Sequence, residues 1–404
     1  MSVDVRTRVD GPHAAVAAGA FFDEQLPGAL DEHAALLAPA LAALNLPPLA
    51  VEVEGAAWTL RVRDQRVRVA PGAGGAAMTL RLGPGQLDDL VRDQATPMGW
   101  FSSGALDLDG RLERILDWWL VLRGALDALA PYPGGGLAFT DPDGSPLDLA
   151  RTFTMADEDA ALAHQLGQAG FLHLRGVFTE AEMAAVSADM DRLAPTYAEG
   201  DGRSWWARTA DGSARLVRMQ GFDHASPTVA GFLGDGRLAR LAGLPGDGHC
   251  WSGSDWNGLE ALVKPIGVIE GISDVPWHKD CSLGRHSYDC CSLTVGISVT
   301  GADADSGQLR VVAGSHRVLV WPALLRKDND LPVVDLPTAT GDVTVHLSCT
   351  LHMAQPPVSR ERRVLYTGFR LPSTTADPAE RRRLRAVREA AAVTVSQPPS
   401  PVGT

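Results

Sequence analysis

Apolar positions divide the chain into two regions with different periodicities. From Gly28 to Asn45 they recur at helical spacing, and Asn45 and two prolines end the segment. Over residues 51–69 apolar and polar positions alternate on both sides of Asp64-Gln65, which predicts a hairpin of half-buried strands. The first region, residues 1–131, is therefore expected to be a small α+β domain. Its remaining predicted elements are a strand over 78–82 and helices over 87–91 and 112–129.

The second region is dominated by short alternating runs. A Pro- and Gly-rich stretch over residues 132–150 is typical of a linker. A domain over 151–372 is expected to follow, opening with a helix over 157–169 and a strand over 170–176. Many short strands with turns between them are typical of a double-sheet jelly roll, so the overall prediction is an α+β protein with a C-terminal jelly roll and flanking helices. The predicted strands cover 262–270, 292–299, 308–313, 341–347 and 363–370.

Three further segments complete the prediction for this region. Thr179 and Glu182 are spaced as a capping box and predict a helix start. Residues 204–218 are aromatic and basic, which fits either a wall of the substrate site or a solvated loop held by Trp205 and Trp206. Residues 373–404 are expected to contain an exposed basic helix over 381–392 and a disordered tail.

Composition narrows the classes of protein. A formal net charge of -13 over 404 residues, without a long basic run, argues against a nucleic-acid partner. The five cysteines show no CxxC spacing, which favours buried apolar side chains in a reducing compartment over a zinc site. No apolar run approaches the roughly 20 residues of a membrane span, so a cytoplasmic protein is the default expectation. The oligomeric state stays open.

The chemistry is concentrated around one short motif. His278 and Asp280 are one residue apart on a segment expected to be extended, so both side chains point the same way. His352 offers a third ligand. Two His and one carboxylate with open coordination positions form the facial triad of non-haem Fe(II) oxygenases. His346 also has the right parity on an ideal strand and is the rival of His352.

The order of the motifs resembles the phytanoyl-CoA dioxygenase family of Fe(II)- and 2-oxoglutarate-dependent oxygenases. Four signatures agree in order and spacing. They are the strand from Gly170 to Phe178, the His278-x-Asp280 element, the Gly307 to Arg317 strand and turn, and Gly341-Asp342 followed by His352 and Arg363.

The resemblance implies an enzyme that uses Fe(II), 2-oxoglutarate and O2, with His278, Asp280 and His352 as catalytic metal ligands. Arg363 follows His352 by the family's spacing and is expected to bind the distal carboxylate of 2-oxoglutarate. Arg362 is its rival, because alternation allows only one of the two to face the interior. Lys264 is a further candidate for a cosubstrate contact, with a surface Lys as the alternative. Halogenating relatives lack the carboxylate, so Asp280 favours hydroxylation, desaturation or ring closure.

Residues 20–130 resemble the sterol carrier protein family through Phe101, Gly104, Leu106 and Gly110. That resemblance implies a tunnel for an apolar molecule, and Trp118-Trp119 would fit its lining. A purely structural or dimerising domain would show the same pattern. The leading hypothesis is thus a dioxygenase that hydroxylates an apolar, lipid-like or terpenoid small molecule. The alternatives are the same enzyme class acting on a polar natural-product intermediate, and a non-catalytic lipid-binding or transfer protein.

Overall fold

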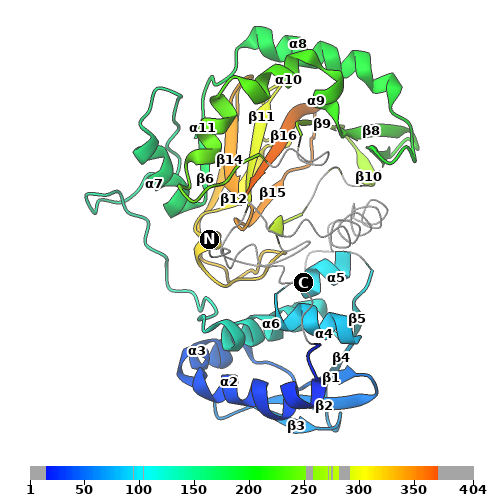
Figure 1. Cartoon of the computed structure of the whole chain (residues 1–404), viewed down its shortest axis with the longest axis vertical. Helices are drawn as coiled ribbons and strands as arrows, with labels where there is room; N and C mark the ends of the chain where they lie inside the picture. The colour runs from blue at the N-terminus through cyan, green and yellow to red at the C-terminus, as the bar shows by residue number, and fades with distance from the viewer. Residues whose placement is uncertain are drawn as a thin grey trace.

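The chain forms an N-terminal and a C-terminal part that stack along the long axis of the molecule (Figure 1). The computed structural model describes residues 15–93, 95–102, 104–251, 258–271, 273, 276–281 and 292–371. The helix and tail expected within 373–404 lie outside these residues. Both parts combine helices with sheets, which confirms the α+β class. Among the described helices, none has the length and apolar character needed to cross a membrane.

The N-terminal part is a five-stranded sheet with helices packed on it, as far as the chain is described. The strand order is β3-β2-β1-β4-β5, and β1 pairs with β4 in parallel while the other pairs are antiparallel. The strands are β1 (Leu49–Val53), β2 (Ala56–Arg63), β3 (Arg66–Pro71), β4 (Met78–Leu82) and β5 (Asp107–Asp109). The helices are α1 (Ala18–Ala20), α2 (Leu26–Glu32), α3 (Ala34–Leu44), α4 (Pro84–Val91), α5 (Pro97–Ser102) and α6 (Leu112–Asp127), with a π-helical turn over Phe21–Gln25.

The predicted hairpin is confirmed at its turn, but it has one strand more than expected. Asp64 and Gln65 both have positive φ (51° and 56°), the backbone of a tight turn between two antiparallel strands. A second turn lies at Glu54-Gly55, with φ of 50° and 84°. It separates β1 from β2 inside the stretch interpreted as a single strand. It was not expected because apolar residues stand on both sides of Glu54-Gly55, although their positions change from odd (Val51 and Val53) to even (Trp58 and Leu60) across it.

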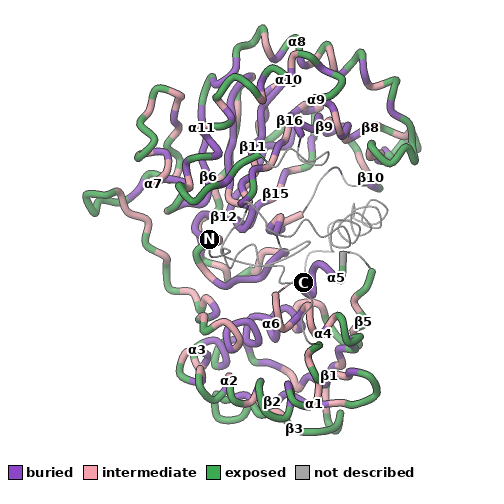
Figure 2. Tube along the Cα trace, in the orientation of Figure 1, coloured by how far each residue is buried: buried purple, intermediate pink, exposed green. Residues whose placement is uncertain are grey.

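Helix α6 is buried over almost its whole circumference (Figure 2). It lies on the side of the N-terminal part that faces the C-terminal part (Figure 1). Trp118 and Trp119 are 0% and 1% exposed, and Trp118 donates to the carbonyl of Pro47 at 2.8 Å. A helix that is apolar all round needs cover on both sides. One side is covered by α2 and α3, and the other by Leu319, Trp321 and Ala323 of the C-terminal part.

The C-terminal part contains two sheets in its described residues. The eight-stranded sheet has the order β10-β7-β8-β9-β16-β11-β14-β6, and the three-stranded sheet has the order β13-β12-β15. The strands of the large sheet are β6 (Phe171–Leu174), β7 (Ser204–Thr209), β8 (Ala214–Met219), β9 (Glu260–Lys264), β10 (Val268–Glu270), β11 (Ser292–Ser298), β14 (Val343–Leu347) and β16 (Arg362–Arg370). The small sheet has β12 (Leu309–Val312), β13 (Val333–Leu336) and β15 (His352–Ala354). The helices are α7 (Asp159–Ala169), α8 (Glu180–Leu193), α9 (Phe222–Ala225), α10 (Pro227–Gly234) and α11 (Arg237–Gly243).

Alternation along the central strands separates an apolar face from a polar face. Leu293, Val295 and Ile297 of β11 belong to the core that also contains residues of α8, α10 and α11, and these helices cover the large sheet in Figure 1. The intervening residues Thr294, Gly296 and Ser298 therefore face the other way, toward the interior between the two sheets. The polar side chains that β11 directs into the interior are therefore at its even-numbered positions.

Several predicted segments differ in detail. Residues 204–218 are not a loop, since β7 and β8 pair as strands that extend the large sheet, and their role as a wall of the substrate site stays a prediction. The predicted strand over 262–270 is two strands, β9 and β10. Strands β13 and β15 were not expected, because each has only three or four residues. The linker is anchored, since the Tyr132 hydroxyl and the Gly135 amide donate to Asp330 at 2.8 and 2.7 Å.

The predicted capping box at the start of α8 is confirmed. Glu182 accepts from the Thr179 amide at 2.7 Å and pairs with Arg237 of α11 at 2.8 Å. The hydrogen bond from Arg237 lowers the pKa of Glu182 from 4.5 to about 2. Because the folded-state pKa lies below the unfolded value, the ionised carboxylate stabilises the fold above pH 4.5, and this contribution is lost as the pH falls toward 2.

We expect Glu182→Gln to destabilise the fold by about 1 kcal/mol near neutral pH, because the cap and the ion pair with Arg237 weaken together. The difference from wild type should shrink as the pH falls below 4.5, where Glu182 begins to protonate. Urea unfolding at several pH values measures this. Glu180→Gln, in the same first turn, is the matched control and should change stability little. An unchanged difference at acid pH would contradict the assignment.

Candidate metal centre

The structure brings His278, Asp280 and His352 together. One ligand atom from each lies within 4.8 Å of the other two. His352 opens β15, and the backbone of His278 pairs with it through two hydrogen bonds of 2.9 Å. His278 therefore extends the small sheet as a single bridge, rather than lying on the longer extended segment expected from the sequence. Asp280 reaches the same point from the turn that follows.

Hydrogen bonds orient both imidazoles. The Nδ1 atom of His278 lies 2.7 Å from the carbonyl of Pro276, and Nδ1 of His352 lies 2.8 Å from the carbonyl of Thr350. A carbonyl only accepts, so each Nδ1 carries the proton and each Nε2 keeps its lone pair. The two Nε2 atoms lie 3.2 and 3.6 Å from Oδ1 of Asp280. Three donor atoms thus converge, and hydrogen bonds of this kind are what hold the ligands of a metal in a fixed orientation.

The carboxylate is oriented as well. Oδ2 of Asp280 accepts from the Thr294 hydroxyl at 2.9 Å, which leaves Oδ1 directed at the two imidazoles. The Asp280 side chain is 35% exposed, whereas those of His278 and His352 are 9% and 7% exposed. The site is therefore buried on the protein side and open at the carboxylate.

The protonation states suit a divalent metal. Burial, followed by the neighbouring His346 and His278, lowers the pKa of His352 well below its usual value, so this imidazole is neutral. Desolvation alone would raise the pKa of Asp280, but the adjacent His352 and His278 hold it well below its usual value. A neutral imidazole and an ionised carboxylate are the forms that bind a metal.

His346 lies beside this cluster. It lies on β14 of the large sheet, not on the strand of His352, so the parity argument from a shared strand was wrong. The two rings nevertheless meet across the interior, with centroids 4.2 Å apart, and Nε2 of His346 lies 3.5 Å from Oδ2 of Asp280. His346 thus contacts the oxygen that Thr294 already binds, and not the oxygen directed at His278 and His352.

The structure places the side chains of Arg362 and Arg363 on opposite faces of β16. Arg363 points toward α8, where it donates to Ser187 at 2.9 Å and pairs with Asp191 at 2.7 Å. Arg362 faces the interior instead. It is 3% exposed, and its Nη1 donates to the carbonyl of Gly307 at 2.6 Å. The two residues thus alternate as expected, and Arg362, not Arg363, is the one that faces the interior.

Lys264 is buried rather than on the surface, with 4% exposure. It is the register partner of Arg362 on the adjacent strand, and its Nζ donates to the carbonyl of Ser273 at 2.5 Å. Directly paired residues of neighbouring strands point to the same face. The structure therefore gathers two cations, Arg362 and Lys264, at one end of the interior.

Thr294 was not recognised in the sequence as a contributor to the site, and Arg362 was named there only as the rival of Arg363. Thr294 was hidden inside an apolar run, and only its alternation with Leu293 and Val295 could have indicated an inward hydroxyl. Arg362 could have been found from the apolar residue three positions later, Leu365, which packs toward the helices and places Arg363 on the same side.

Comparison with known proteins agrees with the geometry. Residues 166–364 match the family model for phytanoyl-CoA dioxygenase, and residues 28–118 match the SCP-2 sterol transfer family. A search of curated proteins found no match.

Several solved structures are similar to part of this chain, among them the following three. AviO1 from Streptomyces viridochromogenes Tue57 is 22% identical, covers 55% of this chain and 98% of its own, and has a TM-score of 0.41. The non-haem α-ketoglutarate-dependent epimerase SnoN from nogalamycin biosynthesis is 20% identical, with coverages of 55% and 92% and a TM-score of 0.40. EctD from S. alaskensis, solved with 2-oxoglutarate and 5-hydroxyectoine, is 19% identical, with coverages of 56% and 81% and a TM-score of 0.43.

The protein is an Fe(II)- and 2-oxoglutarate-dependent oxygenase, a class whose cofactor is iron and whose cosubstrates are 2-oxoglutarate and O2. Residues 166–364 are a domain of the phytanoyl-CoA dioxygenase family, and residues 28–118 are an SCP-2 domain. Both resemblances expected from the sequence are thereby confirmed.

We expect Thr294→Val to weaken metal binding about 10-fold, the lower end for loss of a group that orients a ligand. Valine keeps the shape of threonine but cannot donate to Asp280, so the carboxylate gains freedom to rotate. Anaerobic titration with Co(II), followed by its visible absorption, measures the affinity. Ser298→Ala removes a hydroxyl from the same face of β11, where it bonds Thr338, and should leave Co(II) binding unchanged. Equal losses in both variants would contradict a specific role for Thr294.

Proposed function

We propose that His278, Asp280 and His352 hold the iron of this oxygenase. The proposal is carried by the convergence of two Nε2 atoms and one carboxylate oxygen whose orientations are fixed by Pro276, Thr350 and Thr294. Bound Fe(II) supplies the oxidising chemistry, in which 2-oxoglutarate and O2 are consumed. The protein residues leave adjacent coordination positions open on the exposed side of Asp280.

We propose Arg362 as the residue that binds the distal carboxylate of 2-oxoglutarate. In the described part of the chain its Nε–H has no acceptor and no carboxylate pairs with it. A buried guanidinium without an anion is costly, and a bidentate carboxylate would satisfy it. Arg362 and Tyr366 also line a pocket between the two sheets. Lys264, its register partner, adds a second positive charge there.

The substrate proposed is an apolar small molecule that becomes hydroxylated. The support is the SCP-2 domain fused to the oxygenase domain, since SCP-2 is described as a sterol transfer family. The retained Asp280 supports hydroxylation, because the carboxylate occupies the position that would otherwise be free for another ligand. Sterols and acyl thioesters are the first compounds to test, each scored by the succinate formed above the substrate-free rate.

We expect His278→Ala to reduce succinate formation from 2-oxoglutarate to background in the presence of Fe(II) and ascorbate. Loss of one of three protein ligands leaves the iron too weakly held for turnover. His316→Ala is the control, because His316 contacts the carbonyl of Gly167, away from the cluster, and should retain activity if it folds. Equal succinate formation by His278→Ala and wild type would refute the proposed metal site.

We expect Arg362→Met to raise the KM for 2-oxoglutarate about 10- to 100-fold, because a charge-assisted pair contributes roughly 1.5–3 kcal/mol. Arg363→Met removes the neighbouring guanidinium, whose partners are on α8, and should leave this KM near the wild-type value. Initial rates at varied 2-oxoglutarate distinguish the two. The reverse pattern would restore Arg363 as the cosubstrate residue.

A further inference from the structure

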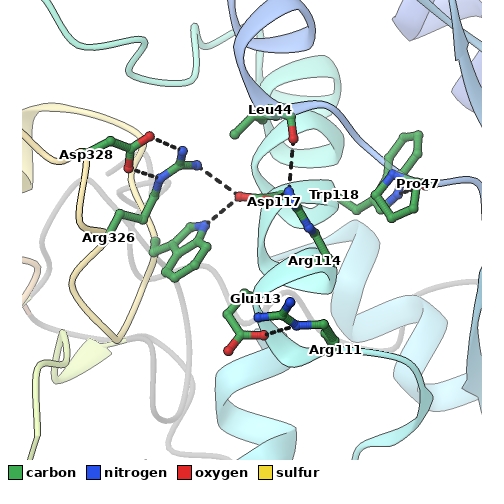
Figure 3. Close-up of polar contacts among 10 residues, drawn as sticks. Leu44, Pro47, Arg111, Glu113, Arg114, Asp117, Trp118, Arg326 and Asp328 are labelled. Carbon is green, nitrogen blue, oxygen red and sulfur yellow. Dashed lines mark hydrogen bonds and ion pairs between the residues drawn. The ribbon is translucent and has the colours of Figure 1, made fainter. Parts of the chain in front are cut away.

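Helix α6 of the N-terminal part carries a buried carboxylate that bonds the C-terminal part. The Asp117 side chain is 4% exposed. Its Oδ1 accepts from Nε1 of Trp321 at 3.1 Å and from Arg326 at 3.0 Å, and its Oδ2 accepts from Arg114 at 3.0 Å (Figure 3). Burial raises the pKa of Asp117, and Arg326 and Trp321 oppose this shift. These partners are therefore what make an ionised group tolerable at this position.

The segment that Asp117 binds, residues 319–330, is joined to the N-terminal part in two further ways. Leu319, Trp321 and Ala323 belong to the same apolar core as α2, α3 and α6. The start of the linker also pairs with it, since the Tyr132 amide donates to the carbonyl of Leu319 at 2.9 Å. The N-terminal part thus holds this segment by charge, by apolar packing and by backbone pairing.

The same segment also pairs with residues 277–279, which include His278. The Lys279 amide donates to the carbonyl of Pro322 at 2.8 Å, and the Leu324 amide donates to the carbonyl of Trp277 at 2.7 Å. Ala323 pairs with His278, and His278 pairs with His352. Residues 322–324 therefore hold the backbone of His278 through an isolated β-bridge.

The pocket at this contact is too small for a cargo molecule. It has a volume of about 60 Å³ and is lined by residues of both parts, including Leu44, Leu120, Trp321 and Arg326. Ligand pockets usually measure about 300–1,000 Å³. At this contact the two parts are packed against each other. Such packing is better suited to fixing the position of one part relative to the other than to passing a ligand between them.

We propose that Asp117 is a positioning residue for the proposed metal ligand His278, acting through Trp321, Arg326 and residues 322–324. The inference rests on the proposed metal site. A ligand set has to be held within about 0.5 Å to be productive. Without the Asp117 carboxylate, Arg326 and Trp321 lose a shared buried acceptor, and residues 322–324 between them are free to move. The N-terminal part is then a structural component of the iron site.

The test compares Asp117→Asn with Asp127→Asn in the full chain. Both residues are on α6 and pair with an arginine, but Asp127 pairs with Arg123 within the N-terminal part, at 2.7 Å. Co(II) is the probe, titrated anaerobically and followed by its visible absorption. Asp117→Asn should weaken binding about 10-fold, as changes to groups supporting a ligand do, and should alter the absorption bands. Asp127→Asn should change neither.

Arg326→Gln provides a second variant, since its side chain is 25% exposed and its loss is easier to accommodate. It should weaken Co(II) binding in the same direction, and the double variant with Asp117→Asn should be less than additive. If Asp117→Asn does not fold, Arg326→Gln decides by the same criteria. Wild-type affinity and unchanged bands in the folded variants, or equal losses in Asp127→Asn, would overturn the inference. Wild-type protein that binds Co(II) no better than His278→Ala would instead refute the metal site itself.

Discussion

The proposed metal centre depends on the backbone pairing that holds His278 between β15 and residues 322–324. His278 exchanges two hydrogen bonds of 2.9 Å with His352, while Trp277 and Lys279 bond residues 322–324 on the other side. Side chains of directly paired residues lie close together, so this pairing places two proposed ligands from distant parts of the sequence at one point. The third, Asp280, follows from the turn and is oriented by Thr294. Without the pairing, the motif His278-x-Asp280 would have no third ligand.

The polar interior follows from the same strand geometry. On β11 the apolar residues face α8, α10 and α11, and Thr294 and Ser298 face the site. On β16 the same rule directs Arg363 to α8 and Arg362 to the interior. If the register of β16 shifted by one residue, Arg363, which pairs with an aspartate, would replace Arg362 as the cation that faces the interior. Function in this domain is therefore very sensitive to register.

The SCP-2 domain is packed more closely against the oxygenase domain than a carrier domain joined only by a flexible linker would be. Its last helix is covered by Trp321 and its neighbours, and the linker is fixed to Asp330. Trp118 and Trp119, which could have lined a tunnel, are core residues with at most 1% exposure. Removal of this domain would expose the apolar face of residues 319–323, so truncation would disturb the oxygenase domain directly. Point variants at the contact between the two domains therefore distinguish a structural role of the SCP-2 domain from a carrier role more cleanly than truncation does.

The sequence alone determined that several local segments are helices or turns, and it determined the ligand types of the His278-x-Asp280 motif. Helical periodicity before Asn45, the turn at Asp64-Gln65, the capping box of Glu182 and the ligand types at 278, 280 and 352 are all local features, encoded within a few residues. Tertiary structure decided the rest, because it depends on pairing between distant segments. The inward arginine, the place of His346 on another sheet, and the bonds from Asp117 across to Trp321 and Arg326 require register and packing that no local pattern contains.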